Sequence, residues 1–179
     1  VGVSVGFSHW RAGYETGRHL AALGYRRIGY VAQDNSLDEY AQRRLDGFRA
    51  ALRKRRLDIV AECHMPEPRD STFGGKLALA RLRAEEPSLD AVYFSHDEMA
   101  IGGYFHCLEA GIAVPGQIAL AGFNGIALGQ ALPTPLTTVL SDRYQLGKLA
   151  GRYALALIDG EAVAPVTDVG FTLVKGATA

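Results

Sequence analysis

The chain has 179 residues, of which 48% are hydrophobic and 21% charged, proportions that indicate a globular protein and argue against a disordered one. Its 19 basic and 19 acidic side chains give a formal net charge of zero. Because nucleic-acid-binding domains usually carry a basic excess, we do not expect these residues to bind DNA directly. No apolar run approaches the roughly 20 residues of a membrane helix, so we expect no membrane association.

The beginning of the chain and its cysteines indicate the cellular context. The first residues, Val1-Gly-Val-Ser-Val-Gly6, include neither an initiator methionine nor the basic and apolar regions of a signal peptide. Cys63 and Cys107 are expected to be small buried hydrophobic residues in a reducing compartment, and no disulfide framework is expected. We therefore expect a piece of a longer, cytoplasmic protein.

Strands and helices are predicted to alternate along the chain, since short apolar runs bounded by turn residues separate stretches of helical periodicity. The predicted strands cover residues 27–32, 57–63, 91–94, 118–123, 136–140 and 166–174. A turn at 7–12 leads into the first predicted helix, a capping box at 36–39 opens the second, and the others cover 71–85, 98–110 and 143–159. This alternation predicts an α/β fold with an open, mostly parallel sheet and helices on both faces.

Polar residues at two predicted helix starts are interpreted as caps. Ser71 is expected to cap the helix that follows it, because its hydroxyl can accept from free backbone N–H groups. Asp97 follows the strand 91–94, and we expect it to cap the next helix or to interact with its dipole.

An enzymatic function is not expected. Ser95, His96 and Asp97 are the residue types of a hydrolytic triad, but consecutive residues at a strand end point to opposite sides and do not line up for catalysis. The sequence has no nucleophile elbow, dinucleotide loop or phosphate loop. Its histidines and cysteines lack metal-ligand spacing. We therefore predict no catalytic residue, no metal site and no cofactor.

Five segments match, in order, the sequence pattern of one family. They are Gly24-Tyr-Arg-Arg-Ile-Gly-Tyr-Val31, Arg44-Leu-Asp-Gly-Phe48, Ser95-His-Asp-Glu-Met-Ala100, Val114-Pro-Gly-Gln-Ile-Ala-Leu-Ala-Gly-Phe-Asn124 and Pro135-Leu-Thr-Thr-Val139. Along essentially its whole length the chain thus resembles the effector-binding domain of bacterial regulators of the lactose and galactose repressor family. The resemblance implies the second subdomain of a periplasmic-binding-protein-like fold.

The resemblance also implies a division of the chain. Residues 1–7 would be the end of an absent first subdomain and the crossover from it, and residues 8–140 would form the second subdomain. Residues 141–160 would cross back to the absent subdomain and supply a helix that packs on it. Residues 161–179 would return to the second subdomain as its last strand. The apolar face of that helix is expected to be exposed or covered by another copy of the chain; it comprises Tyr144, Leu146, Leu149, Tyr153 and Leu157.

Three residues match ligand-contacting positions of the family. Arg44 matches its ligand-binding arginine, and a guanidinium can grip hydroxyls or a carboxylate with paired donors; alone it could equally be a solvated helix arginine. His96 stands where the family often has asparagine, and it could instead be a surface turn residue. Asn124 replaces a common aspartate, and it could simply be a turn residue that tolerates unusual backbone angles.

Further candidates lie near the expected crossovers. Trp10 would stack on a sugar ring or pack onto the helix that follows, and Phe7 and His9 lie on the same turn. By position in the family, Arg69, Asp70 and Ser141 are also candidate ligand contacts.

The charge of the expected cleft indicates the kind of effector. Asn124 and Gly125 replace two acidic residues of the family pattern, while Arg44, His96 and Arg11 add positive charge. This favours an acidic effector, such as a sugar acid, over a neutral sugar. The Pro-Glu-Pro loop within 66–71 is weakly similar to the gluconate-type repressors, which agrees with this interpretation.

The helix at 98–110 carries more large apolar side chains than one face needs, and in the family it contributes to a homodimer interface. The alternative is burial on both sides within the domain. The residues concerned are Ile101, Tyr104, Phe105 and Leu108.

The function that the resemblance implies is effector sensing by a transcriptional regulator, which contacts DNA only through an absent N-terminal helix-turn-helix. A solute-binding protein of a sugar transporter shares the architecture and is the main alternative. A sugar-processing enzyme is a third possibility, which turnover would reveal.

Overall fold

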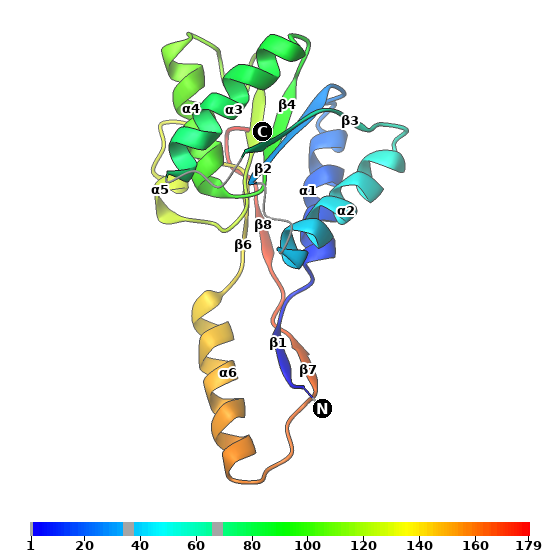
Figure 1. Ribbon diagram of the computed structural model, residues 1–179, viewed down its shortest axis with the longest axis vertical. Coiled ribbons are helices and arrows are strands. Elements are labelled where there is room, and N and C mark those ends of the chain that lie inside the picture. The colour runs from blue at the N-terminus through cyan, green and yellow to red at the C-terminus, as the bar shows by residue number, and fades with distance from the viewer. Residues whose placement is uncertain (1, 34–37, 66–69) are drawn as a thin grey trace.

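The structure is a computed structural model that describes residues 2–33, 38–65 and 70–179. Figure 1 shows a larger body that contains both the sheet and most helices, and a narrow projection below it. In chain order the elements are β1 (Ser4–Gly6), α1 (His9–Ala22), β2 (Ile28–Gln33), α2 (Glu39–Arg53), β3 (Ile59–Met65), α3 (Ser71–Glu85), β4 (Ala91–Phe94), α4 (Asp97–Glu109), β5 (Ala119–Ala121), α5 (Ala127–Gln130), β6 (Thr138–Leu140), α6 (Arg143–Ile158), β7 (Val166–Asp168) and β8 (Thr172–Val174).

The body is organised around a parallel sheet of order β3-β2-β4-β5. Alternate residues of each strand point to opposite faces, so the sheet has two separate cores. Val31, Val92 and Phe94 pack with α3 and α4 on one face, whereas Tyr30 and Tyr93 pack with α1 and α2 on the other. The predicted α/β fold with helices on both faces is therefore confirmed.

Each helix pair crosses at reciprocal glycines. A Cβ at Gly13 of α1 would lie 1.8 Å from the carbonyl oxygen of Arg44, and a Cβ at Gly47 of α2 would lie 1.9 Å from that of Trp10. On the other face, Gly75 of α3 and Gly102 of α4 make the same kind of backbone approach. The contacts of Gly13 and Gly47 fix the first half of α1 against the second and third turns of α2.

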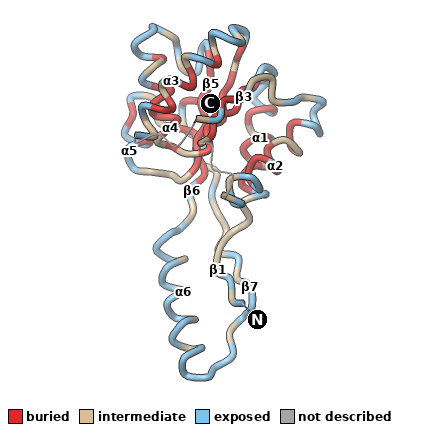
Figure 2. Tube along the Cα trace, viewed as in Figure 1, coloured by how far each residue is buried: buried red, intermediate tan, exposed pale blue. Residues whose placement is uncertain are grey.

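The projection below the body consists of β1, β7 and α6 (Figure 1). β1 and β7 form a parallel pair, and α6 contacts β1. No residue of α6 is buried, and Figure 2 shows this helix in the colour of exposed residues. Leu146, Leu149 and Tyr153 of its expected apolar face are half-buried, whereas Tyr144 and Leu157 are exposed.

Two expectations about the strands and helix starts require correction. Residues 166–174 do not form one strand, because β7 pairs with β1 while β8 turns back to pair antiparallel with β6. The first helix already begins at His9, since the hydroxyl of Ser8 accepts from the Arg11 N–H at 3.2 Å. Residues 9–12 are therefore helical and do not form a turn.

Two helix caps also differ from the prediction. Asp38 caps α2 by accepting from the Ala41 N–H at 2.9 Å, and Ser36 of the expected capping box lies outside the described residues. Asp70 caps α3 by accepting from the Thr72 N–H at 2.8 Å, so Ser71 is the first helical residue and not the cap. In both cases a carboxylate adjacent to the helix takes the position, as the positive end of the helix dipole favours.

Candidate functional site: a buried cationic cluster at the strand ends

Arg44 is the centre of the candidate site. It lies on the second turn of α2, and only 3% of its surface is exposed. Its Nη1 donates to Nδ1 of His9 at 2.9 Å, and the guanidinium carbon lies 4.1 Å from the centroid of the Phe123 ring. The Nε and Nη2 atoms are shielded from solvent and donate to no described residue. The predicted alternative of a solvated helix arginine is therefore wrong.

The charge of Arg44 has no carboxylate partner in an ion pair among the described residues. A buried guanidinium normally has such a partner, because transferring an unpaired charge out of water is costly. Each buried donor left without an acceptor costs about 1–3 kcal/mol. The site is thus a pre-formed cationic centre with unused donors.

His9 is the hydrogen-bond partner of Arg44. Its ring lies between Phe7, with centroids 4.5 Å apart, and Tyr40, with centroids 4.7 Å apart. Burial and the nearby Arg44 charge lower the pKa of His9 to about 4, so the imidazole is neutral at pH 7. Since a guanidinium can only donate, Nδ1 accepts and the ring proton resides on Nε2.

Tyr93 is a member of this cluster that sequence reasoning missed. It lies in the centre of the sheet, and its buried hydroxyl has no hydrogen-bond partner among the described residues. Burial raises the pKa of Tyr93 to about 12, and Arg44 acts in the opposite direction, both through its charge and because its side chain lies next to the Tyr93 hydroxyl. In the sequence this tyrosine was indistinguishable from any other core residue of a strand.

His96 and Asn124 come together at the ends of β4 and β5. The amide nitrogen of Asn124 lies 3.4 Å from Nδ1 of His96, an arrangement in which the amide donates to a neutral ring. Burial, followed by the Arg44 charge, lowers the pKa of His96. Asn124 has a φ of +118°, so its backbone has the unusual angle that the turn interpretation required, while its side chain still points at His96.

Asp97 supports this end of the sheet and does not cap α4. Its carboxylate is fully buried and accepts from the Thr138 hydroxyl at 2.6 Å and from the Ile126 N–H at 2.9 Å. A Cβ at Gly122 would lie 2.2 Å from that carboxylate, which is why the strand that precedes Asn124 needs glycine there. The residue at the N-cap position is His96, which makes no side-chain cap bond.

A hollow of about 520 Å³ opens between the first turns of α1 and α2 and the projection. Phe7, His9 and Trp10 line it from the body, and Leu146 of α6 lines it from the projection. Trp10 is 43% exposed and stacks on Tyr14, with ring centroids 5.1 Å apart. The predicted turn residues thus face a cleft, with His9 connecting its wall to Arg44.

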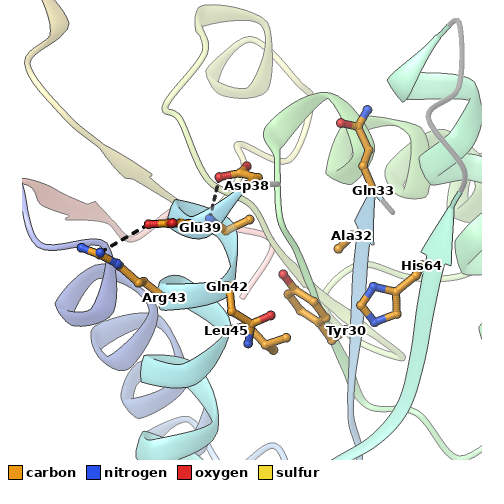
Figure 3. Close-up of a pocket in the computed structure, with 10 residues that line it drawn as sticks. Tyr30, Ala32, Gln33, Asp38, Glu39, Gln42, Arg43, Leu45 and His64 are labelled. Atoms are coloured by element: carbon orange, nitrogen blue, oxygen red, sulfur yellow. Dashed lines mark hydrogen bonds and ion pairs between the residues drawn. The ribbon is translucent and has the colours of Figure 1, made fainter. Parts of the chain in front are cut away.

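A second hollow of about 470 Å³ lies between α2 and the ends of β2 and β3 (Figure 3). Its walls include Tyr30, Gln42 and His64, but not Arg44, His96 or Asn124. Asp38 is engaged as a helix cap and Glu39 pairs with Arg43 at 3.6 Å (Figure 3). Because these acidic groups already have partners, this hollow offers fewer free polar groups than the Arg44 cluster.

The remaining sequence candidates are located elsewhere. Asp70 serves as the cap of α3, and Arg69 lies outside the described residues. Ser141 lines a third hollow beside Phe171, and its carbonyl accepts from the Arg143 N–H at 2.9 Å. Arg11 also faces Phe171, at 6.0 Å from the ring centroid. No hydrogen bond or ion pair joins Asp70, Ser141 or Arg11 to Arg44.

The four apolar residues of α4 divide between the core and the surface. Ile101 and Tyr104 are buried, and the Tyr104 hydroxyl lies 3.1 Å from that of Thr134. Only Phe105 and Leu108 are exposed. The alternative of burial on both sides therefore holds for two of the four, and a partner chain would meet only the other two. Both cysteines, Cys63 and Cys107, are buried and free, as predicted.

Across residues 2–33, 38–65 and 70–179, no three or more His, Cys, Asp or Glu side chains are grouped to hold a metal ion. Over the same residues, no helix combines the length and apolarity required to cross a membrane.

Comparison with known proteins agrees with this architecture. The model of the periplasmic binding protein-like domain family matches residues 18–179. A curated HTH-type transcriptional regulator GntR from Pseudomonas aeruginosa is 37% identical over 94% of this chain and 49% of its own length. Its Escherichia coli K12 counterpart is 34% identical over 97% of this chain and 52% of its own. The chain thus spans about half the length of these relatives.

Solved structures give the same assignment. The transcription regulator GntR from Chromobacterium violaceum superposes with a TM-score of 0.93 at 38% identity, covering 99% of this chain and 65% of that one. A LacI-family regulator from Silicibacter pomeroyi superposes with a TM-score of 0.90 at 35% identity, covering 97% and 53%. The chain therefore belongs to the LacI family of transcriptional regulators, in the part that has the periplasmic-binding-protein-like fold.

Proposed function

We propose that this chain is the effector-sensing part of a bacterial transcriptional regulator and that its effector is a small sugar acid, such as gluconate. The observation that carries the proposal is the buried Arg44, whose charge has no carboxylate partner among the described residues. A ligand carboxylate would neutralise this charge and accept from the free donors, with the paired geometry that guanidinium groups favour. A neutral sugar would leave the charge unpaired.

The groups around Arg44 support an anionic ligand. The Asn124 amide and the Tyr93 hydroxyl can both donate, and both lie in the cluster. The buried carboxylate beside it, Asp97, is already occupied by Thr138 and Ile126. The described cluster therefore offers mainly donors to a ligand. The names of the similar GntR regulators agree with a sugar acid.

The alternatives receive less support. The similar proteins are named as transcriptional regulators and not as transport proteins, so a solute-binding protein is not favoured. The side chains of Ser95 and Asp97 diverge: the serine hydroxyl lies 3.8 Å from the Met99 sulfur, whereas the carboxylate faces Thr138. This arrangement supports a sensor and not a hydrolase.

The shielding of Arg44 from solvent would couple effector binding to a change of conformation. Because solvent does not reach Nε and Nη2, an anion pairs with them only after a covering side chain moves. An effector can shift a conformational equilibrium only by its difference in affinity for the two states. We propose that the cytoplasmic regulator reads this shift as a change in DNA affinity, through a helix-turn-helix domain outside this chain, and that it acts as a homodimer.

We further propose that β1, α6 and β7 belong to another subdomain, with residues 1–7 and 141–160 as its parts and crossovers. The support is the exposure of α6, where Ile158 is 80% exposed. Large exposed apolar side chains usually mark a contact surface. The body formed by residues 8–140, together with the part of the return that follows β7, would then be the effector-binding subdomain.

The proposal is tested by isothermal titration of the full-length protein with gluconate, glucose and ribose. We expect gluconate to bind, and Arg44→Met to weaken its binding at least about tenfold, because a hydrogen bond to a charged group contributes about 1.5–3 kcal/mol. Arg81→Met removes an exposed arginine of α3 far from the cluster and should leave affinity unchanged. Binding of the neutral sugars alone, or undiminished gluconate binding by Arg44→Met, would exclude the sugar-acid assignment.

A further inference from the structure

Arg44 has one hydrogen-bond partner among the described residues, Nδ1 of His9 at 2.9 Å. Its other close neighbour is the ring of Phe123 at 4.1 Å. A cation–π contact attracts the guanidinium to the ring face but does not fix its position over the ring. A hydrogen bond to one terminal nitrogen fixes that position. His9 therefore determines which edge of the guanidinium remains free.

His9 is itself immobilised. Its ring stacks on Phe7, with centroids 4.5 Å apart, and packs at a tilt against Tyr40, with centroids 4.7 Å apart. Its backbone is on the first turn of α1, which the Gly13 and Gly47 contacts hold against α2. These contacts fix the plane of the imidazole, and the hydrogen bond to Arg44 selects the ring orientation in which Nδ1 faces the guanidinium.

We propose that His9 is a positioning residue, which through Nδ1 holds Arg44 against Phe123 and keeps the shielded Nε–Nη2 edge of the guanidinium unbonded, so that the effector can pair with it once the covering side chain moves. The inference rests on the proposed function, because it concerns the site that would bind the acid. An arginine whose orientation is fixed loses less side-chain entropy when it binds an anion. His9 would thus increase affinity without touching the ligand's acid group.

The charged groups around His9 favour the neutral acceptor form that this role requires. From α2, Arg44 and Arg43 both disfavour a proton on the ring, whereas Asp38 at the cap of α2 favours one. Burial adds to the effect of the arginines, and together they outweigh the aspartate.

The first part of the test needs no effector. Nitrogen-15 NMR of the histidine rings in the full-length protein, with His9 assigned by its loss in His9→Gln, identifies which ring nitrogen carries the proton. We expect the Nε2–H tautomer with an unprotonated, hydrogen-bonded Nδ1. In Arg44→Met the Nδ1 signal should shift toward that of a tautomer mixture. A proton on Nδ1 in the wild type would overturn the proposal.

The second part uses gluconate as the probe in a double-mutant cycle. His9→Phe keeps an aromatic ring between Phe7 and Tyr40 but removes the acceptor, and we expect about tenfold weaker binding, the usual effect of losing a charged hydrogen bond. His9→Gln supplies a carbonyl acceptor and should recover part of that loss. In an Arg44→Met background, His9→Phe should weaken binding no further, because the two residues act through one contact.

The outcomes separate this inference from the function on which it rests. Equal losses from His9→Phe with and without Arg44 would mean that His9 acts independently, and would overturn the positioning role while leaving the sugar-acid effector intact. If the wild type binds no sugar acid, the proposed function fails. The NMR result then still decides whether His9 holds Arg44.

Discussion

Gly13 of α1 and Arg44 of α2 are in backbone contact, so close that a Cβ at position 13 would lie 1.8 Å from the Arg44 carbonyl oxygen. The residue that centres the site is thus also the point at which two helices meet. Gly13→Ala must separate α1 from α2, and we expect it to destabilise the protein by about 1–3 kcal/mol, as overpacking usually does. Urea-induced unfolding followed by circular dichroism measures this change.

A matched control is available in α6. Gly151 lies in that helix, and a Cβ there would meet nothing within 4 Å. Gly151→Ala should therefore leave stability unchanged or raise it by up to about 1 kcal/mol through helix propensity. If Gly13→Ala were as harmless as Gly151→Ala, the close crossing of α1 and α2 would be wrong.

Replacing Arg44 is expected to have the opposite effect on stability from its effect on binding. Methionine fills a similar volume without a charge, and hydrophobic replacements of buried charged groups are often neutral or stabilising. We expect Arg44→Met to leave the unfolding free energy unchanged or to raise it by up to about 2 kcal/mol. Chemical denaturation without ligand measures this change; a loss of more than about 2 kcal/mol would show that the described neighbours already stabilise the charge.

The lowered pKa of His9 predicts a pH dependence of stability. Its folded-state pKa is about 4, below the ordinary value of 6.5, so an unfolded chain takes up this proton at a higher pH than the folded protein. The contribution of His9 is therefore complete above pH 6.5 and is lost as the pH falls toward 4. Because the ring is only half-buried, we expect a loss of about 1–2 kcal/mol.

The measurement is the unfolding free energy of the wild type and of His9→Phe between pH 7.5 and about 4. Because all other titratable groups are the same in the two proteins, the difference between the two free energies reports on His9. As the pH falls, the unfolding free energy of the wild type should decrease more than that of His9→Phe. A difference that is constant across this range would mean that His9 titrates with an ordinary pKa.

Trp10 should report ligand binding. It is the single tryptophan of the chain, and it lies on the wall of the hollow between the body and the projection. Closure of that hollow around an effector would shield the ring from water, so we expect a blue-shifted emission and weaker acrylamide quenching on addition of gluconate. Trp10→Phe should abolish the signal, and glucose should not produce it. Unchanged Trp10 emission at saturating ligand would show that the hollow does not close.

The alternation of strands and helices could be predicted from the sequence because apolar periodicity is a local property. Helix caps were harder to predict, because Ser36 and Ser71 have suitable side chains but the caps are Asp38 and Asp70. Adjacent residues with similar capping ability cannot be separated by spacing alone. The strand predicted at 166–174 failed for a related reason, since its two halves pair with different strands.

The members of the candidate site that belong to a family motif could be predicted from the sequence. The members that only the fold brings together could not. Arg44, His96 and Asn124 were found from the family pattern, and the structure gathers them at the strand ends. The cap role predicted for Asp97 was wrong because its partners, Ile126 and Thr138, are 29 and 41 residues away in sequence. The alternative of an interaction with the helix dipole is compatible with its place in the first turn of α4. Tyr93 was missed because only the packing of α2 on the sheet brings its hydroxyl near the guanidinium.

The chain passes between projection and body at separate places: after β1, before α6 and after β7. A single connection would act as a swivel, about which the two parts could turn freely. Several parallel connections resist twisting of one part against the other but still allow a hinge-like bending. The paired ends of β1 and β7, where the Val169 N–H donates to the Gly6 carbonyl at 2.8 Å, tie two of these connections together. We therefore expect the projection to move against the body by opening and closing the hollow beside Trp10 more readily than by twisting.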